Sequence, residues 1–144
     1  MRASAFGLVA LVLAAAAPAA AEQGVVAKLD IDGVINPVTL RLVGVAIERA
    51  EAEGAQALLI QLDTPGGLER SMRGIVQRML NARIPVIVYV APTGARAASA
   101  GVFITMAAHV AAMAPATNIG AASPVALGGG ADKTMMKKIE NDAA

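Results

Sequence analysis

The sequence has no cysteine among its 144 residues and only one histidine, His109. Without cysteine the fold must be stable without disulfide bonds, and thiol catalysis and cysteine metal sites are excluded. A lone imidazole without clustered carboxylates makes a poor zinc site. We therefore predict that the protein uses no metal or other cofactor, and that His109 has a structural role.

A strong charge of either sign is also lacking. The 12 basic and 11 acidic side chains give a formal net charge of +1. So small a net charge gives no electrostatic reason to bind nucleic acid or acidic lipid. We expect neither among the partners of this protein.

The N-terminus has the form of a secretory signal peptide. Arg2 precedes an apolar run at residues 5–17, and a string of small residues ends at Ala21, before Glu22. The apolar run is too short for a comfortable transmembrane span, although an uncleaved membrane anchor is the alternative. Removal of residues 1–21 leaves 123 residues with 11 basic and 11 acidic side chains. That length is sufficient for one domain, residues 22–144, with a core of its own.

Apolar strands alternate with amphipathic helices along the mature chain, which predicts an α/β fold with parallel strands joined by crossover helices. Strands are expected at residues 25–29, 57–62, 86–90 and 109–114. Helices are expected from Asn36 and Pro37 to Gly54, around the apolar stripe at residues 72–80, and over residues 97–108. Residues 117–120 are expected to form a loop.

The C-terminal part of the sequence predicts an interrupted element. Gly128 to Gly130 form a flexible spacer, after which Asp132 or Thr134 caps a helix that begins near Met135. No helix stop signal precedes Ala144. We therefore expect the sequence to be a fragment, truncated at the C-terminus of its domain.

Two segments are candidates for a catalytic site. Ser99 lies among small residues at the expected start of the 97–108 helix, where unpaired N–H groups can stabilise an oxyanion. Residues 63–67, Asp-Thr-Pro-Gly-Gly, follow a parallel strand at the sheet edge where ligand sites gather, and the two glycines leave N–H groups uncovered. Each segment alone also has an ordinary interpretation, Ser99 as a helix N-cap and residues 63–67 as a strand-to-helix turn. Because both follow neighbouring strands, we predict that they face one crevice.

Three motifs resemble the NfeD family of membrane-associated serine proteases. They are Leu-Asp-Thr-Pro-Gly-Gly at residues 62–67, Ala-Ala-Ser-Ala-Gly at 97–101 and Met-Ala-Pro-Ala-Thr-Asn-Ile-Gly-Ala-Ala at 113–122. The resemblance covers essentially the whole mature chain and implies a Clp-protease/crotonase-like fold. It also implies a serine–lysine endopeptidase that cleaves an apolar segment of a stomatin-like membrane protein at the extracytoplasmic face. The resemblance further implies membrane helices and a small β-barrel domain downstream, and a dimeric or larger assembly.

The resemblance also implies roles for individual residues. Ser99 matches the nucleophile of the family, and the N–H groups of Gly67 and Ala100 match its oxyanion hole. Lys138, which begins the stretch Lys-Ile-Glu-Asn, matches the catalytic lysine, with Lys137 as the runner-up. A desolvated lysine can act as a base because burial lowers the pKa of its ammonium group.

Two other classes of protein stay open at this point. A non-catalytic module would bind stomatin-like partners through the same crevice. A crotonase-type enzyme would use paired N–H groups on an acyl-CoA thioester, but coenzyme A chemistry is cytoplasmic and the chain carries an export signal.

Overall fold

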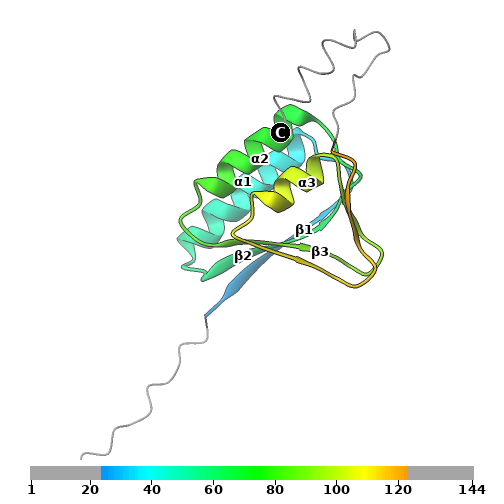
Figure 1. Cartoon of the computed structure of the whole chain (residues 1–144). Coiled ribbons are helices and arrows are strands. Elements are labelled where there is room, and N and C mark those ends of the chain that lie inside the picture. The colour runs from blue at the N-terminus through cyan, green and yellow to red at the C-terminus, as the bar shows by residue number, and fades with distance from the viewer. Residues whose placement is uncertain (1–23, 123–144) are drawn as a thin grey trace, which may run out of the picture.

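The computed structural model describes residues 24–122 (Figure 1). Its elements are β1 (Val26–Asp32), α1 (Pro37–Ala52), β2 (Ala57–Asp63), α2 (Glu69–Leu80), β3 (Val86–Val90), β4 (Arg96–Ala98), α3 (Ala100–Met106), β5 (Val110–Met113) and β6 (Asn118–Gly120). The predicted signal peptide, glycine spacer and C-terminal helix lie outside the described residues.

Four parallel strands form the main sheet in the order β1-β2-β3-β5. Each connection within this sheet moves one position in the same direction, and right-handed crossovers then bring every connecting helix to one face. Figure 1 shows α1, α2 and α3 together on that face. The α/β fold predicted from the alternating pattern is confirmed.

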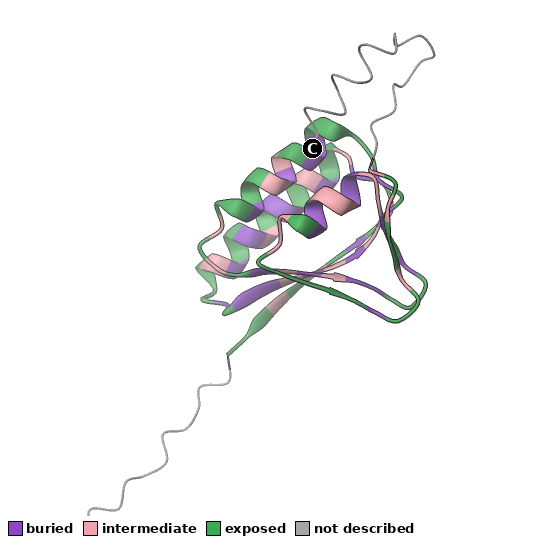
Figure 2. Ribbon diagram, viewed as in Figure 1, coloured by how far each residue is buried: buried purple, intermediate pink, exposed green. Residues whose placement is uncertain are grey.

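The core lies between the helices and this face of the sheet. Alternate residues of the two central strands point toward the helices and are buried: Leu58, Ile60 and Leu62 in β2, and Val86, Val88 and Val90 in β3. They pack with buried helix residues, among them Val43, Ile47, Ile75, Met79 and Ile104. Figure 2 shows the buried stripes of the helices facing inward. This packing fixes the positions of the strand ends that carry the candidate site.

The first helix begins where the sequence predicts. The Asn36 Oδ1 accepts hydrogen bonds from the N–H groups of Val38 and Thr39 at 2.8 and 3.1 Å, and Pro37 occupies the first helical turn. An asparagine N-cap supplies acceptors for donors that the helix leaves unpaired. No helix within residues 24–122 is long and apolar enough to cross a bilayer.

The segment around residue 97 differs from the prediction. Arg96–Ala98 form strand β4, which pairs in parallel with β6, so residues 97–99 are not helical and residues 118–120 are not a loop. The Thr64 N–H donates to the Arg96 carbonyl at 2.7 Å, and the Ala98 N–H donates to the Thr64 carbonyl at 3.0 Å. These long-range bonds hold an alanine-rich segment extended, although its local composition favours helix.

Candidate active site

Ser99 and the glycine turn meet at the carboxyl edge of the sheet. A Cβ atom built on Gly66 would lie 2.7 Å from the Ser99 Cβ and 3.2 Å from its Oγ, so the turn and the serine are in direct contact. Gly66 also has a φ of +110°, which only glycine adopts without strain. The structure therefore brings together the two segments that the sequence predicts to face one crevice.

Ser99 does not lie in the first turn of a helix, as the sequence suggested, but just before α3. Its φ of 52° and ψ of −113° mark the point where extended β4 turns sharply into the helix. A non-glycine residue with positive φ is uncommon, and such strain clusters at functional sites. The Ser99 N–H donates to the Gly120 carbonyl at 2.9 Å, so β6 supports this conformation.

The alternative interpretation of Ser99 as a capping residue does not hold. Ser99 occupies the N-cap position, but its side chain makes no capping hydrogen bond. Within residues 24–122 its half-buried hydroxyl has no hydrogen-bond partner at all.

Two backbone donors stand near this serine. Neither the Gly67 N–H nor the Ala100 N–H donates to an acceptor within the described part of the chain. Ile35 fixes the glycine turn from the other side, because its N–H donates to the Gly66 carbonyl and its carbonyl accepts from the Leu68 N–H, both at 2.8 Å. Donors held in this way can bind an anionic oxygen without reorganising.

Ile35, Gly120 and Thr64 were not among the predicted site residues, although all three position the turn or the serine. Ile35 forms a parallel bridge with Gly67, and a Cβ atom on Gly67 would collide with the Ile35 backbone. Their roles do not follow from local pattern, because each of the three bonds to a segment that is distant in the chain: Ile35 to Gly66, Gly120 to Ser99 and Thr64 to Ala98. Lys137 and Lys138 lie outside the described residues.

His109 has the structural role that the sequence predicts. Its Nδ1 accepts a hydrogen bond from the Val86 N–H at 3.1 Å, and the backbone N–H of His109 donates to the Val86 carbonyl at 2.9 Å. Val86 begins β3, whereas Ser99 lies beyond the opposite, carboxyl end of the same sheet. The two ends of β3 are roughly 13 Å apart at about 3.3 Å per residue. His109 is therefore too far away to accept a proton from Ser99.

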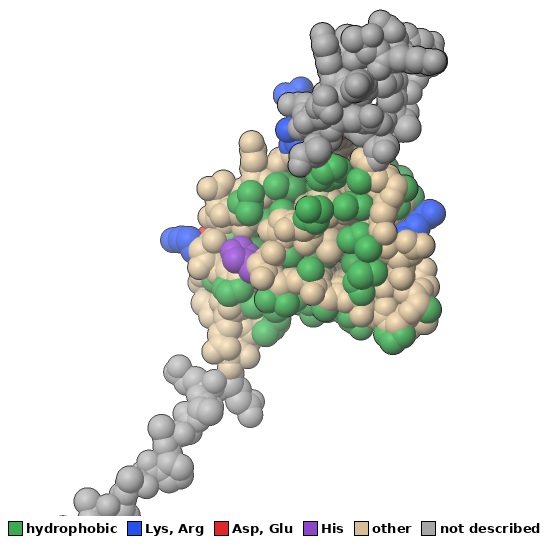
Figure 3. All heavy atoms as spheres, in the orientation of Figure 1, with side chains coloured by type: hydrophobic (Ala, Val, Ile, Leu, Met, Phe, Trp, Pro, Cys, Tyr) green, Lys and Arg blue, Asp and Glu red, His purple; other side chains and the backbone are tan. Residues whose placement is uncertain are grey.

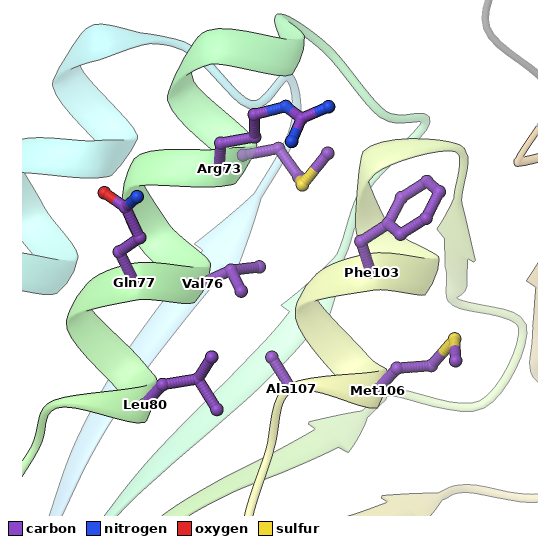
Figure 4. A pocket seen from close by; sticks show the side chains of 8 residues that line it. Arg73, Val76, Gln77, Leu80, Phe103, Met106 and Ala107 are labelled. Carbon is purple, nitrogen blue, oxygen red and sulfur yellow. The ribbon is translucent and has the colours of Figure 1, made fainter. Parts of the chain in front are cut away.

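An apolar groove of about 430 Å³ lies between α2 and α3. Its lining consists of Met72, Arg73, Val76, Gln77, Leu80, Phe103, Met106 and Ala107. In Figure 4 the Val76 and Leu80 side chains point from α2 toward α3. Both helices begin at the edge of the sheet that carries Ser99, and the groove follows them from Met72 and Phe103 toward Leu80 and Ala107.

Arg73 is the one charged side chain among the residues that line the groove. The face seen in Figure 3 presents hydrophobic side chains, with charged ones mainly at its margins. Residues 24–122 contain no group of three or more histidine, cysteine, aspartate or glutamate side chains arranged to hold a metal ion.

The carboxyl group of Glu51 has a lowered pKa, caused first by the hydrogen bond from the Arg83 N–H and then by the Arg83 guanidinium. That pair joins the end of α1 to the residues before β3.

The structure is a Clp-protease-like α/β domain. It has a parallel sheet with helices on one face, and a glycine turn that contacts the serine after β4. The chain belongs to the NfeD1b N-terminal domain family, whose sequence profile matches residues 25–140. It is also similar to the membrane-bound protease PH1510 of Pyrococcus horikoshii, with 46% identity over 103 residues. The aligned region is 72% of this chain and 23% of that protein.

Solved structures of a relative agree with this membership. One is the membrane-bound stomatin-specific protease 1510-N, solved as a lysine-to-alanine variant with a substrate peptide. It superposes on this chain with a TM-score of 0.71 at 42% identity. That match covers 78% of this chain and 50% of the other. The 1510-N protease specific for a stomatin homologue from Pyrococcus horikoshii gives a TM-score of 0.66 at 46% identity, covering 69% and 50%. The chain thus spans about half of these solved chains and under a quarter of the curated relative.

Proposed function

We propose that this domain is a serine endopeptidase in which Ser99 is the nucleophile and Lys138 the general base. The observation that carries the proposal is the contact of Ser99, whose hydroxyl has no partner within residues 24–122, with a turn that offers the Gly67 N–H. A nucleophile beside fixed donors is the arrangement that acyl transfer requires.

The proposed reaction proceeds in two stages. The neutral Lys138 amine takes the proton from the Ser99 hydroxyl as its Oγ attacks the peptide carbonyl, and the Gly67 and Ala100 N–H groups bind the resulting oxyanion. The tetrahedral intermediate collapses, and the leaving amine takes the proton back from the lysine. Water, activated by the same amine, then hydrolyses the acyl-enzyme to release the carboxylate and regenerate Ser99.

Two findings support a lysine as the base. His109, the single histidine of the chain, lies at the opposite end of the sheet from Ser99. Solved structures of the relative 1510-N include a lysine-to-alanine variant and a serine-to-alanine variant. Lys138 is our choice from its sequence context, with Lys137 as the alternative.

The proposed substrate is an apolar segment of a stomatin-like membrane protein. The relatives are described as stomatin-specific proteases, and one was solved with a substrate peptide. The groove between α2 and α3, two helices that begin at the Ser99 edge of the sheet, offers an apolar surface. Apolar side chains of a peptide gain free energy when such a surface removes them from water.

The dyad is tested in the complete protein with a peptide from a stomatin-like C-terminal segment. We expect Ser99→Ala and Lys138→Ala each to abolish cleavage, and the double variant to be little worse than either, because residues that act as a unit are not additive. Lys137→Ala is the matched control and should have a mild effect. The wild-type rate should rise with pH, since only the neutral amine accepts a proton.

A fluorophosphonate probe separates the protease from the remaining classes. Labelling of the wild type but not of Ser99→Ala supports a nucleophilic serine. Absence of labelling in the folded wild-type protein would favour a non-catalytic module or an acyl-CoA enzyme. Near-normal cleavage by Lys138→Ala with loss in His109→Ala would replace the dyad with a histidine mechanism.

The role of the Gly67 N–H needs a backbone substitution. Any side chain at this position would collide with the Ile35 backbone, so Gly67→Pro would disturb the turn as well as remove the donor. Semisynthesis that replaces the residue 67 amide by an ester removes the N–H alone. We expect kcat to fall on the order of a hundredfold. An unchanged kcat would remove Gly67 from the oxyanion hole.

We also propose that the protein is exported and acts at the extracytoplasmic face of the membrane, as an oligomer. The curated relative is described as membrane-bound, which supports a membrane location. Mass spectrometry of the exported protein should find Glu22 at the N-terminus. Retention of Met1 in the membrane fraction would instead indicate an uncleaved anchor.

A further inference from the structure

We propose that Thr64 is a positioning residue that sets the oxyanion-binding turn against Ser99, an inference that rests on the proposed function. Thr64 follows β2 and is fully buried. No charged or reactive group marks it in the sequence, yet it contacts both halves of the candidate site. Its hydroxyl, its backbone and its methyl group each make a different contact.

The hydroxyl closes the glycine turn. The Thr64 Oγ1 accepts a hydrogen bond from the Gly66 N–H at 3.0 Å and lies 3.2 Å from the Gly66 carbonyl, to which it donates. Gly66 is held at both its peptide groups in this way, and Gly67 is the next residue. The direction of the Gly67 N–H follows from the orientation of the peptide that joins these two glycines.

The backbone and the methyl group connect the same residue to the segment that carries the nucleophile. The Thr64 carbonyl accepts from the Ala98 N–H at 3.0 Å, immediately before Ser99. The Thr64 Cγ2 lies 2.7 Å from the position that a Cβ atom on Gly101 would occupy, immediately after Ala100. Thr64 therefore connects the turn that carries the Gly67 N–H to Ala98 and Gly101. These two residues flank the nucleophile Ser99 and the second donor, Ala100.

Loss of the hydroxyl should act on the transition state more than on substrate binding. The oxyanion exists only after attack, so a misdirected donor lowers kcat and leaves KM almost unchanged. Displacement of a catalytic group by about 1 Å can cost on the order of a hundredfold in rate. A role in stability alone would give a folded variant with normal kcat.

Two matched pairs of variants in the complete protein test this role. Thr64→Val replaces the hydroxyl of the wild-type side chain by a methyl group, and Thr64→Ala differs from Thr64→Ser only in lacking the hydroxyl. In each pair we expect the member without the hydroxyl to have a kcat about ten- to a hundredfold lower. KM should stay within about twofold, and Thr64→Ser should recover most of the wild-type kcat.

Thr105→Val is the control for the loss of a buried threonine hydroxyl. Thr105 is also buried, and its Oγ1 donates to the Gly101 carbonyl at 2.8 Å within α3, away from the turn. Thermal unfolding first establishes that Thr105→Val is fully folded at the assay temperature. We then expect its kcat to equal that of the wild type. Equal kcat values within both Thr64 pairs, or an effect confined to KM, would overturn the proposal. Failure of the protease assignment itself is recognised separately, by cleavage that persists in Ser99→Ala.

Discussion

Gly66 packs against Ser99 so closely that a Cβ atom at residue 66 would lie 2.7 Å from the Ser99 Cβ and 3.1 Å from the Ala98 carbonyl oxygen. A side chain at residue 66 would therefore have to displace either the turn after β2 or the residue that precedes α3. Two features therefore require glycine at residue 66: the φ of +110° and the close approach of Ser99, which leaves no room for a side chain.

Gly66→Ala should reduce activity strongly. The added methyl group must displace Ser99 or the turn, and we expect kcat to fall on the order of a hundredfold. Gly54→Ala is the matched control, because Gly54 also has a positive φ, +69°, but an added Cβ there meets nothing within 4 Å. Both variants should lose about 1–3 kcal/mol of stability from backbone strain, and Gly54→Ala should keep its activity. Peptide cleavage beside chemical unfolding measures the two effects, and equal activities would contradict this interpretation.

His109→Ala should alter stability and leave catalysis intact. The Val86 N–H loses its side-chain acceptor, which should cost roughly 0.5–1.5 kcal/mol. The distance from the carboxyl edge of the sheet predicts a kcat/KM within about twofold of the wild type. Urea unfolding and peptide cleavage on the same preparation test both statements. A large loss of kcat in fully folded His109→Ala would place the imidazole in the reaction.

Asn36→Ala should destabilise the first helix. The variant leaves the Val38 and Thr39 N–H groups without the Asn36 Oδ1 acceptor, and an N-cap of this kind contributes about 1 kcal/mol. Asn36→Asp keeps an acceptor oxygen and should retain most of the stability. The denaturation midpoint of the three proteins provides the measurement, and identical midpoints for Ala and Asp would argue against a capping role.

Glu51→Gln should change how stability depends on pH. The Arg83 N–H donates to Glu51 Oε1 at 2.7 Å and the Arg83 guanidinium reaches Oε2 at 2.8 Å, and together they lower the pKa of the Glu51 carboxyl group. A lowered pKa in the folded state means that the ionised group stabilises the fold above its ordinary pKa of about 4.3. That stabilisation is lost as the pH falls through the folded-state pKa.

We therefore expect Glu51→Gln to be less stable than the wild type at pH 7 and equal to it in acid. Glu48→Gln is the control, because the Glu48 side chain is 73% exposed and its contact with Arg78 is long, at 3.5 Å. Exposed ion pairs contribute little to stability. Thermal unfolding between pH 7 and pH 3 measures the difference, and a constant gap over that range would contradict the linkage.

Local pattern in the sequence was sufficient to predict most of the fold. The apolar strand at Val86–Val90 and the start of α1 at Asn36 were predicted at the observed residues, because burial and capping depend on neighbouring side chains. The meeting of Ser99 with the glycine turn also followed, since carboxyl ends of adjacent parallel strands share one edge.

The sequence failed where a distant partner decided the backbone. Residues 97–98 look helical and residues 118–120 look irregular by composition. In the structure Arg96–Ala98 pair with Asn118–Gly120, and the same segment also bonds to Thr64. An alanine-rich segment adopts either conformation at little cost, so the long-range hydrogen bonds select the strand.

The sequence by itself determined the strand and helix order, the one-sided core and the residue types available for chemistry. Tertiary structure decided the positive φ of Ser99, the hydrogen bonds of Thr64 to Arg96 and Ala98, and the separation of His109 from the serine. The physical reason is range. Hydrophobic period and helix caps act over a few residues, whereas the geometry of this site depends on contacts between segments more than 20 residues apart, such as Ser99 with Gly120 and Thr64 with Ala98.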